Sequence, residues 1–260
     1  LSVDVQINQL ATILLEHSVR LQPGERVLIK GHLPAKPLLE ALIEQAYALN
    51  AMPYVELIDQ ELTRKLAFGY SKAQLETLAA WEMKKYQDVD AIIIVIAEDN
   101  DAEMSDVPKD KFQLRGEVMK PVSDFYVNNR RWVLLNYPTP ALAQKAKMST
   151  AAFFDYFFKV CTADYRKMAE ALKPLKTMME KTDKVRITGP GTDLTFSIKG
   201  IPAIPCAGEA NIPDGEVFTA PVKHSINGKI TFNTPCPYRG QTFHHVSLTF
   251  KDGKIIEATA

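Results

Sequence analysis

The stretch Ala91-Ile92-Ile93-Ile94-Val95-Ile96-Ala97 decides the fold class of this 260-residue chain. It is apolar at every position, and it is bounded by Asp90 on one side and by Glu98-Asp99-Asn100 on the other. A short run that is rich in isoleucine and apolar on both faces is typical of a central strand in a parallel sheet. The same run is far too short to cross a membrane, which takes about 20 residues.

The segments on both sides of this run alternate between helical and strand patterns. The apolar face of an opening helix is predicted to consist of Ile7, Leu10, Ala11, Leu14, Ser18 and Val19. Further strands are expected at 26–30, 54–58 and 131–136, and further helices at 38–46, 60–68, 71–86, 103–127 and 140–181. This alternation predicts an α/β fold, with an open, mainly parallel sheet that carries helices on both faces.

After Asp183 the helical periodicity ends, and short strands with Gly, Pro and Asn turns follow at 185–188, 194–198, 229–232, 243–250 and 254–258. We therefore expect an α/β domain over residues 1–182 and a β-rich second domain over residues 183–260. Asp252-Gly253 predicts a two-residue hairpin turn near the end of the chain. Because the chain stops directly after the return strand, we expect the second domain to be incomplete and the chain to be a fragment of a longer polypeptide.

Composition excludes several classes of function. Lys and Arg total 31, as do Asp and Glu, so the basic excess of a nucleic-acid-binding protein is absent. The three cysteines are not spaced as a C-x-x-C pair, which favours a reducing compartment. The N-terminus also lacks a basic start followed by an apolar run. These features predict a cytoplasmic protein without nucleic-acid or membrane partners.

The glycine-rich and histidine-containing segments have ordinary structural interpretations. Gly189-Pro190-Gly191 precedes a strand rather than a helix, so a hairpin turn is favoured over a phosphate loop. His17 lies off the apolar face of the first helix and is expected in solvent. His244 and His245 are adjacent on a predicted strand and would point to opposite faces. His32 ends the first strand, where open α/β sheets bind ligands, and His224 follows the 211–222 stretch.

Carboxylates flank a turn in the second domain. Pro213-Asp214-Gly215 predicts a tight turn, with Glu209 before it and Glu216 after it. One interpretation is an acidic loop exposed to water; the other is a carboxylate that a rigid turn holds for a divalent ion. The nearby Cys206 is expected to be a small buried apolar residue rather than a reactive thiol.

The stretch Asn211-Ile212-Pro213-Asp214-Gly215-Glu216-Val217-Phe218-Thr219-Ala220-Pro221 resembles the signature of the thermophilic metallo-aminopeptidase family, of the aminopeptidase T and aminopeptidase S type. The resemblance extends in order along essentially the whole chain. It includes Leu21–Ile29, Tyr137–Gln144, Lys184–Leu194, Ser225–Gly228 and Phe250–Ile255.

The resemblance implies an exopeptidase that removes N-terminal residues from peptides and works as a homodimer. It implies two divalent ions per site, drawn from Zn, Co, Mg or Mn, which polarise the scissile carbonyl and activate a water. The glutamate that closes the family's N-x-P-x-x-E motif is a metal ligand and corresponds to Glu216. Glu209 is expected to lie beside the ligand rather than to bind the ion.

The chain also departs from the family pattern. Members continue for about a hundred residues more, and that continuation supplies a second Glu, His and Asp ligands and a Tyr. Nothing here matches it, so the metal site is expected to be incomplete and the chain by itself inactive. Two alternatives stay open: a non-catalytic fragment or relative that binds peptides or partners, and an α/β enzyme that acts on a small molecule near His32.

Overall fold

The computed structural model describes residues 3–238 and 241–260. Its contacts divide the chain into two units: Leu1–Arg166 with Ala207–Asp214, and Lys167–Cys206 with Gly215–Ala260. The first unit thus takes up a short segment from the region that the sequence assigns to the second domain. The predicted boundary at 182/183 coincides with a change of secondary structure, since the last helix ends at Lys181 and the next strand begins at Lys184.

The first unit is built on a five-stranded sheet in the order β2-β1-β3-β4-β8, and every neighbouring pair is parallel. Its strands are β1 (Arg26–His32), β2 (Met52–Ile58), β3 (Ala91–Ile96), β4 (Arg131–Asn136) and β8 (Asn211–Ile212). The predicted central strand is confirmed, because β3 lies between β1 and β4 and its Ile92 and Ile93 are fully buried.

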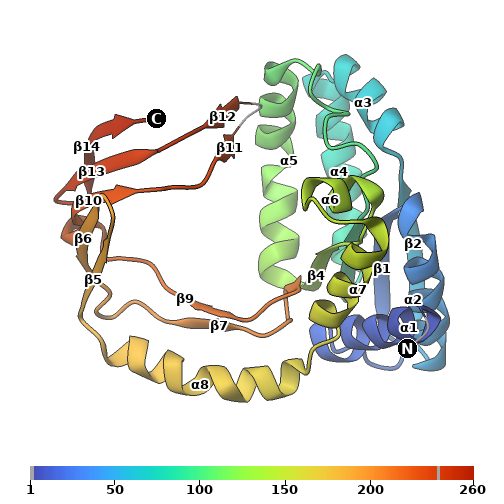
Figure 1. Ribbon diagram of the computed structural model, residues 1–260. Helices are drawn as coiled ribbons and strands as arrows, with labels where there is room; N and C mark the ends of the chain where they lie inside the picture. Colours follow the sequence, from blue (N-terminus) through green and yellow to red (C-terminus); the bar gives the residue numbers. More distant parts are fainter. Residues whose placement is uncertain (1–2, 239–240) are drawn as a thin grey trace. The chain divides into compact units, whose positions relative to one another are not determined.

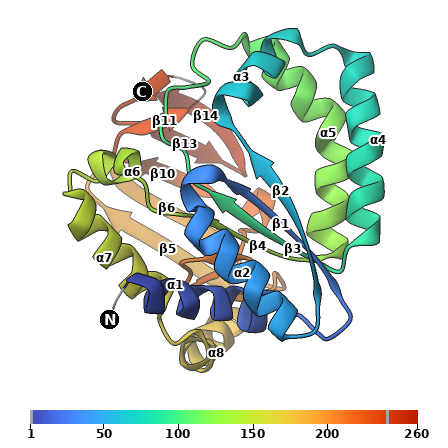
Figure 2. The ribbon, with the colours of Figure 1, turned by 90° about the vertical axis from the view of Figure 1, so that its right-hand side faces the viewer.

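Helices cover both faces of this sheet, which confirms the predicted fold class (Figure 2). The helix α2 packs on one face, where Leu39 fills the space beside Gly31 of β1. Side chains of α4 and α5 cover the other face around Leu28 and Ile92. The helices of this unit are α1 (Val3–Thr12), α2 (Lys36–Ala48), α3 (Gln60–Gly69), α4 (Lys72–Asp88), α5 (Lys109–Asn129), α6 (Pro140–Lys145) and α7 (Thr150–Cys161), with a 3₁₀ turn at Leu33–Ala35.

The helix predicted from residue 103 begins later, at Lys109. Pro108 occupies the N-cap position, and a proline disfavours the helical conformation in the residue before it. Residues 101–106 therefore form turns ahead of α5. Among the described residues, no helix is both long and apolar enough to span a membrane.

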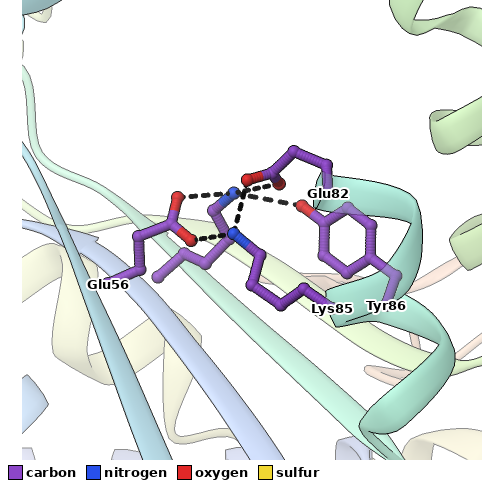
Figure 3. A network of polar contacts seen from close by, with 5 residues as sticks. Glu56, Glu82, Lys85 and Tyr86 are labelled. Atoms are coloured by element: carbon purple, nitrogen blue, oxygen red, sulfur yellow. Dashed lines mark hydrogen bonds and ion pairs between the residues drawn. The ribbon is translucent and has the colours of Figure 1, made fainter. Parts of the chain in front are cut away.

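A charged network joins β1 and β2 to α4 (Figure 3). Lys30 Nζ lies 2.8 Å from Glu56 Oε1, 3.4 Å from Glu82 Oε2 and 3.0 Å from the Tyr86 hydroxyl. Lys85 pairs with both Glu56 and Glu82. Two ammonium groups face two carboxylates, so the charges balance and each group has hydrogen-bonding partners, as partly buried charges require.

This network shifts the pKa of its members. Burial acts to lower the pKa of Lys30, but Tyr86, Glu56 and Glu82 outweigh it and hold the pKa above its usual value. Burial acts to raise the pKa of Glu56, but hydrogen bonds from Lys30 and Lys85 hold it below the usual value. Both groups therefore stay charged around neutral pH, where they hold α4 against the sheet.

The second unit contains a five-stranded antiparallel sheet in the order β14-β13-β10-β6-β5 (Figure 1). Its strands are β5 (Lys184–Gly189), β6 (Thr192–Ser197), β10 (Asn227–Thr231), β13 (Ser247–Lys251) and β14 (Lys254–Thr259). Two short pairs accompany it: β7 (Ile204–Cys206) with β9 (Glu216–Phe218), and β11 (Cys236–Tyr238) with β12 (Gln241–Phe243). The helix α8 (Tyr165–Lys181) precedes β5, and Lys223–Ser225 forms a 3₁₀ turn.

Both predicted hairpin turns are confirmed. Pro190-Gly191 joins β5 to β6 through the pair Gly189↔Thr192, so this segment is a turn and not a phosphate loop. Asp252-Gly253 joins β13 to β14 with both residues at positive φ, as a type I′ turn requires. The predicted single strand at 243–250 is wrong: β12 ends at Phe243, β13 begins at Ser247, and His245 between them has φ +53°.

Candidate functional site

The segment Ala207–Asp214 is the part of the acidic turn region that belongs to the first unit. Its strand β8 extends the parallel sheet, with Asn211 opposite Leu134 and Ile212 opposite Leu135 of β4. The Leu134 N–H donates to the Ala210 carbonyl at 3.0 Å, and Ile212 is buried. The stretch that the sequence presents as an exposed loop therefore contains an edge strand with a buried apolar anchor.

Two carboxylates close the segment on itself. The Gly208 N–H donates to Asp214 Oδ2 at 2.9 Å, and the Ala207 N–H donates to Glu209 Oε2 at 3.0 Å. The Asp214 bond thus joins the two ends of the segment, where Pro213 forms a bend rather than the predicted tight turn. Glu209 is an exposed residue whose carboxylate caps a backbone N–H of its own loop.

A histidine and a tyrosine of the first unit contact the start of this segment. His17 Nε2 lies 2.7 Å from the Ala207 carbonyl oxygen, and the His17 ring stacks on Tyr165 with centroids 5.9 Å apart. Gly208 has φ +90°, and a β-carbon there would lie 3.0 Å from the Tyr165 ring. Only glycine suits this position, because it combines positive φ with close contact to an aromatic ring.

The expectation that His17 lies in solvent is wrong, since its side chain is half-buried against Tyr165 and Ala207. The prediction assumed a regular α-helix, but Ile13–Ser18 forms a π-helical turn. There the Val19 N–H bonds to the Leu14 carbonyl at 3.0 Å, so the turn holds one residue more than an α-helical turn. The extra residue rotates the following side chains about the helix axis.

Glu216 begins β9 and follows Asp214 by two positions along the chain. It is exposed and stands directly opposite Cys206 in the antiparallel pair of β7 and β9. Opposite residues in such a pair project from the same face of the ribbon, so the Glu216 carboxylate and the Cys206 thiol are neighbours. Cys206 is half-buried, which corrects the expectation of a buried residue.

The described residues do not make a metal site by themselves. No group of three or more His, Cys, Asp or Glu side chains among them could hold an ion. A hydrolytic metal needs about three protein ligands, and Glu216 with Cys206 offers two donors at most. Glu216 and Cys206 alone therefore do not make up a hydrolytic metal site, and no catalytic step can be derived through a metal from these residues.

The remaining histidines do not gather into a site within the described chain. His32 is buried, and its Nδ1 lies 3.3 Å from the Ala97 N–H and 3.4 Å from the Val95 carbonyl of the neighbouring strand. This contact ties β1 to the end of β3 at the point where the strand order reverses. His224 is exposed in the 3₁₀ turn, and the pair His244-His245 is exposed between β12 and β13 rather than on one strand.

Comparisons with known proteins find matches that cover nearly all of this chain. Aminopeptidase 2 of Geobacillus stearothermophilus is 22% identical, and aminopeptidase PepS of Streptococcus thermophilus is 24% identical; each match covers 98% of this chain and 70% of the relative. The structure of wild-type AmpT from Thermus thermophilus superposes with a TM-score of 0.82 at 20% identity, over 99% of this chain and 72% of that one, which shows the same fold. The profile of the thermophilic metalloprotease family, M29, matches residues 3–260, and the chain belongs to that family.

Proposed function

We propose that the full-length protein is a metal-dependent aminopeptidase that hydrolyses N-terminal residues from peptides through a two-metal centre, in which Glu216 binds one of the ions, and that the metal site is incomplete in this chain. The observation that carries the proposal is the position of Glu216. It is the last residue of the N-x-P-x-x-E motif in a member of the family. It lies two positions after the segment 207–214, which hydrogen bonds hold at both ends. A ligand on a fastened segment suits a metal site, which demands angular precision.

The proposal includes the remaining parts of the centre. The other ligands come from outside the described residues, because Glu216 and Cys206 cannot complete a site. The β-rich part from residue 183 carries the metal ligand Glu216, and residues 1–182 form the α/β part. Two copies of the chain form the working enzyme in the cytoplasm, with peptides as substrates and Zn, Co, Mg or Mn as the bound ions.

A second candidate is a relative that binds peptides or partner proteins without hydrolysis. The absence of a three-ligand group among the described residues favours it. The two candidates differ in metal uptake and in the fate of a bound peptide, so one experiment separates them.

The full-length protein is incubated with an unblocked peptide and with its N-acetylated counterpart, with each divalent ion in turn, and release of the N-terminal residue is followed by mass spectrometry. We expect release from the unblocked peptide only, with loss on chelation and in Glu216→Gln. The matched control is Glu257→Gln, an exposed carboxylate in β14, which should keep full activity. Peptide binding without release and without metal uptake would instead support the non-catalytic relative.

A further inference from the structure

We propose that His17 is a positioning residue, which holds the segment 207–214 through the Ala207 carbonyl; this segment ends two positions before Glu216 in the chain. Only the link to Glu216 rests on the proposed function. The hold on the segment stands on the contacts of the first unit alone.

The hydrogen bond between His17 and Ala207 has one possible direction. A carbonyl oxygen can only accept, so Nε2 carries the proton that is donated over 2.7 Å. The donor survives in both the neutral and the charged imidazole, because Nε2–H is present in each. The role of the contact is therefore to hold the segment.

A stacked tyrosine fixes the His17 ring. Tyr165 stacks on it at an angle of 29°, and the Tyr165 hydroxyl donates to the Val160 carbonyl at 3.1 Å, so the tyrosine is itself anchored. Tyr165 also contacts Gly208, whose lack of a side chain leaves room for the tyrosine ring. His17 thus contacts Tyr165, and Tyr165 contacts Gly208, while His17 itself lies in the π-helical turn.

The π-helical turn carries a local cost that supports a functional role. Such turns are rare and occur often at functional sites. The Ser18 hydroxyl in this turn is buried and has no hydrogen-bond partner within the described chain, which is unfavourable in a protein interior.

His17 also lines a cavity of about 210 Å³ together with Glu16, Asp164, Tyr165 and Arg166. A cavity of this size beside the ring allows a small molecule to reach the position of a shortened side chain. Imidazole itself can therefore be used to replace the ring in His17→Ala. The comparison compound is 1-methylimidazole, which at alkaline pH has the same ring with a methyl group in place of the N–H.

The experiment measures amide hydrogen exchange of the peptide that spans 207–214, in metal-free buffer with a chelator. His17→Phe keeps an aromatic ring on Tyr165 without the donor, and we expect the Ala207 and Gly208 amides to exchange about tenfold faster, as the loss of one part-buried hydrogen bond predicts. His17→Gln, which keeps an N–H donor, should restore most of the protection. In His17→Ala, imidazole should restore it and 1-methylimidazole should not.

The control variant is His224→Phe, at an exposed histidine of the 3₁₀ turn Lys223–Ser225, and it should leave exchange in 207–214 unchanged. Two outcomes would overturn the proposal: exchange at wild-type rate in His17→Phe, or faster exchange that spreads equally over β1 and β3 in every variant. Metal titration of Glu216→Gln decides the proposed function separately, because the exchange measurement contains no metal.

Discussion

The Gly208 N–H donates to the Asp214 carboxylate across the two ends of the segment 207–214, at 2.9 Å. Gly208 is buried, so this bond satisfies a donor that has little access to water. The bond joins the two ends of the segment, and its removal should loosen the segment together with its edge strand β8.

Asp214→Ala should therefore lower the free energy of unfolding by about 1–3 kcal/mol, the usual cost of a buried backbone donor left without a partner. Urea unfolding followed by circular dichroism measures this change. Asp214→Asn keeps a carbonyl acceptor and is expected to lose less than half as much. Equal losses in the two variants would show that the charge, and not the accepted hydrogen bond, is what matters.

Gly208→Ala should destabilise the protein more than Gly24→Ala. Both glycines have positive φ, at +90° and +80°, so alanine strains the backbone at each by about 1 kcal/mol. Only at Gly208 would the new β-carbon also press on the ring of Tyr165, whereas nothing lies within 4 Å at Gly24. The difference between the thermal unfolding midpoints of the two variants measures the cost of the contact with Tyr165. Identical midpoints would show that this contact costs nothing.

Glu56→Gln should destabilise the protein at neutral pH but not in acid. The pKa of Glu56 is lower in the folded chain than in the unfolded chain, where it is about 4.3. Its charge therefore stabilises the fold above about pH 4, and this contribution disappears as pH falls through the folded pKa. We expect a loss of about 1 kcal/mol at pH 7, at the low end for charged hydrogen bonds because a third of the side chain is exposed.

The measurement compares urea unfolding of the wild type and Glu56→Gln at pH 7 and at about pH 3. The matched control is Glu40→Gln, whose carboxylate pairs with Lys36 on the exposed side of α2. That variant should change stability by less than about 0.5 kcal/mol at either pH. A Glu56→Gln difference that is constant with pH would contradict the role of charge in the network.

The three cysteines should differ in their reaction with iodoacetamide. Burial raises the pKa of Cys161 to about 12, so this thiol stays protonated and unreactive. The exposed Cys236 should react first and the half-buried Cys206 more slowly. Peptide mapping by mass spectrometry gives the rate at each position.

Because Cys206 stands opposite Glu216, a divalent ion bound at Glu216 should slow the alkylation of Cys206. In Glu216→Gln the same ion should have no effect, while Cys236 serves as the internal reference in both proteins. An ion that protects Cys206 equally in both proteins would place the metal elsewhere.

Some of these features follow directly from the sequence. The strand at 91–97 could be predicted because a run that is apolar on both faces has to be covered on both sides. The hairpin at Asp252-Gly253 could be predicted because few residues tolerate positive φ at both turn positions. The motif that ends at Glu216 pointed to the family, which the match over residues 3–260 confirms.

Other features could not be predicted. His17 was misplaced because a helical wheel assumes a constant number of residues per turn, and the π-helical turn breaks that assumption. The strand at 243–250 was drawn too long because a left-handed residue such as His245 leaves no trace in the apolar pattern. The role of Asp214 was assigned to its own turn, while its carboxylate in fact accepts from Gly208.

The sequence by itself determined the parallel sheet, the hairpins and the family, because periodicity, turn chemistry and motif are local properties of the chain. Only the tertiary structure decided where residues 207–214 lie. Their strand β8 is short, and its partners on β4, together with His17 and Tyr165, are distant in sequence. Hydrogen bonds to such distant residues form only when the chain has folded. No local pattern could therefore reveal which parts of the chain hold residues 207–214, the segment that precedes Glu216.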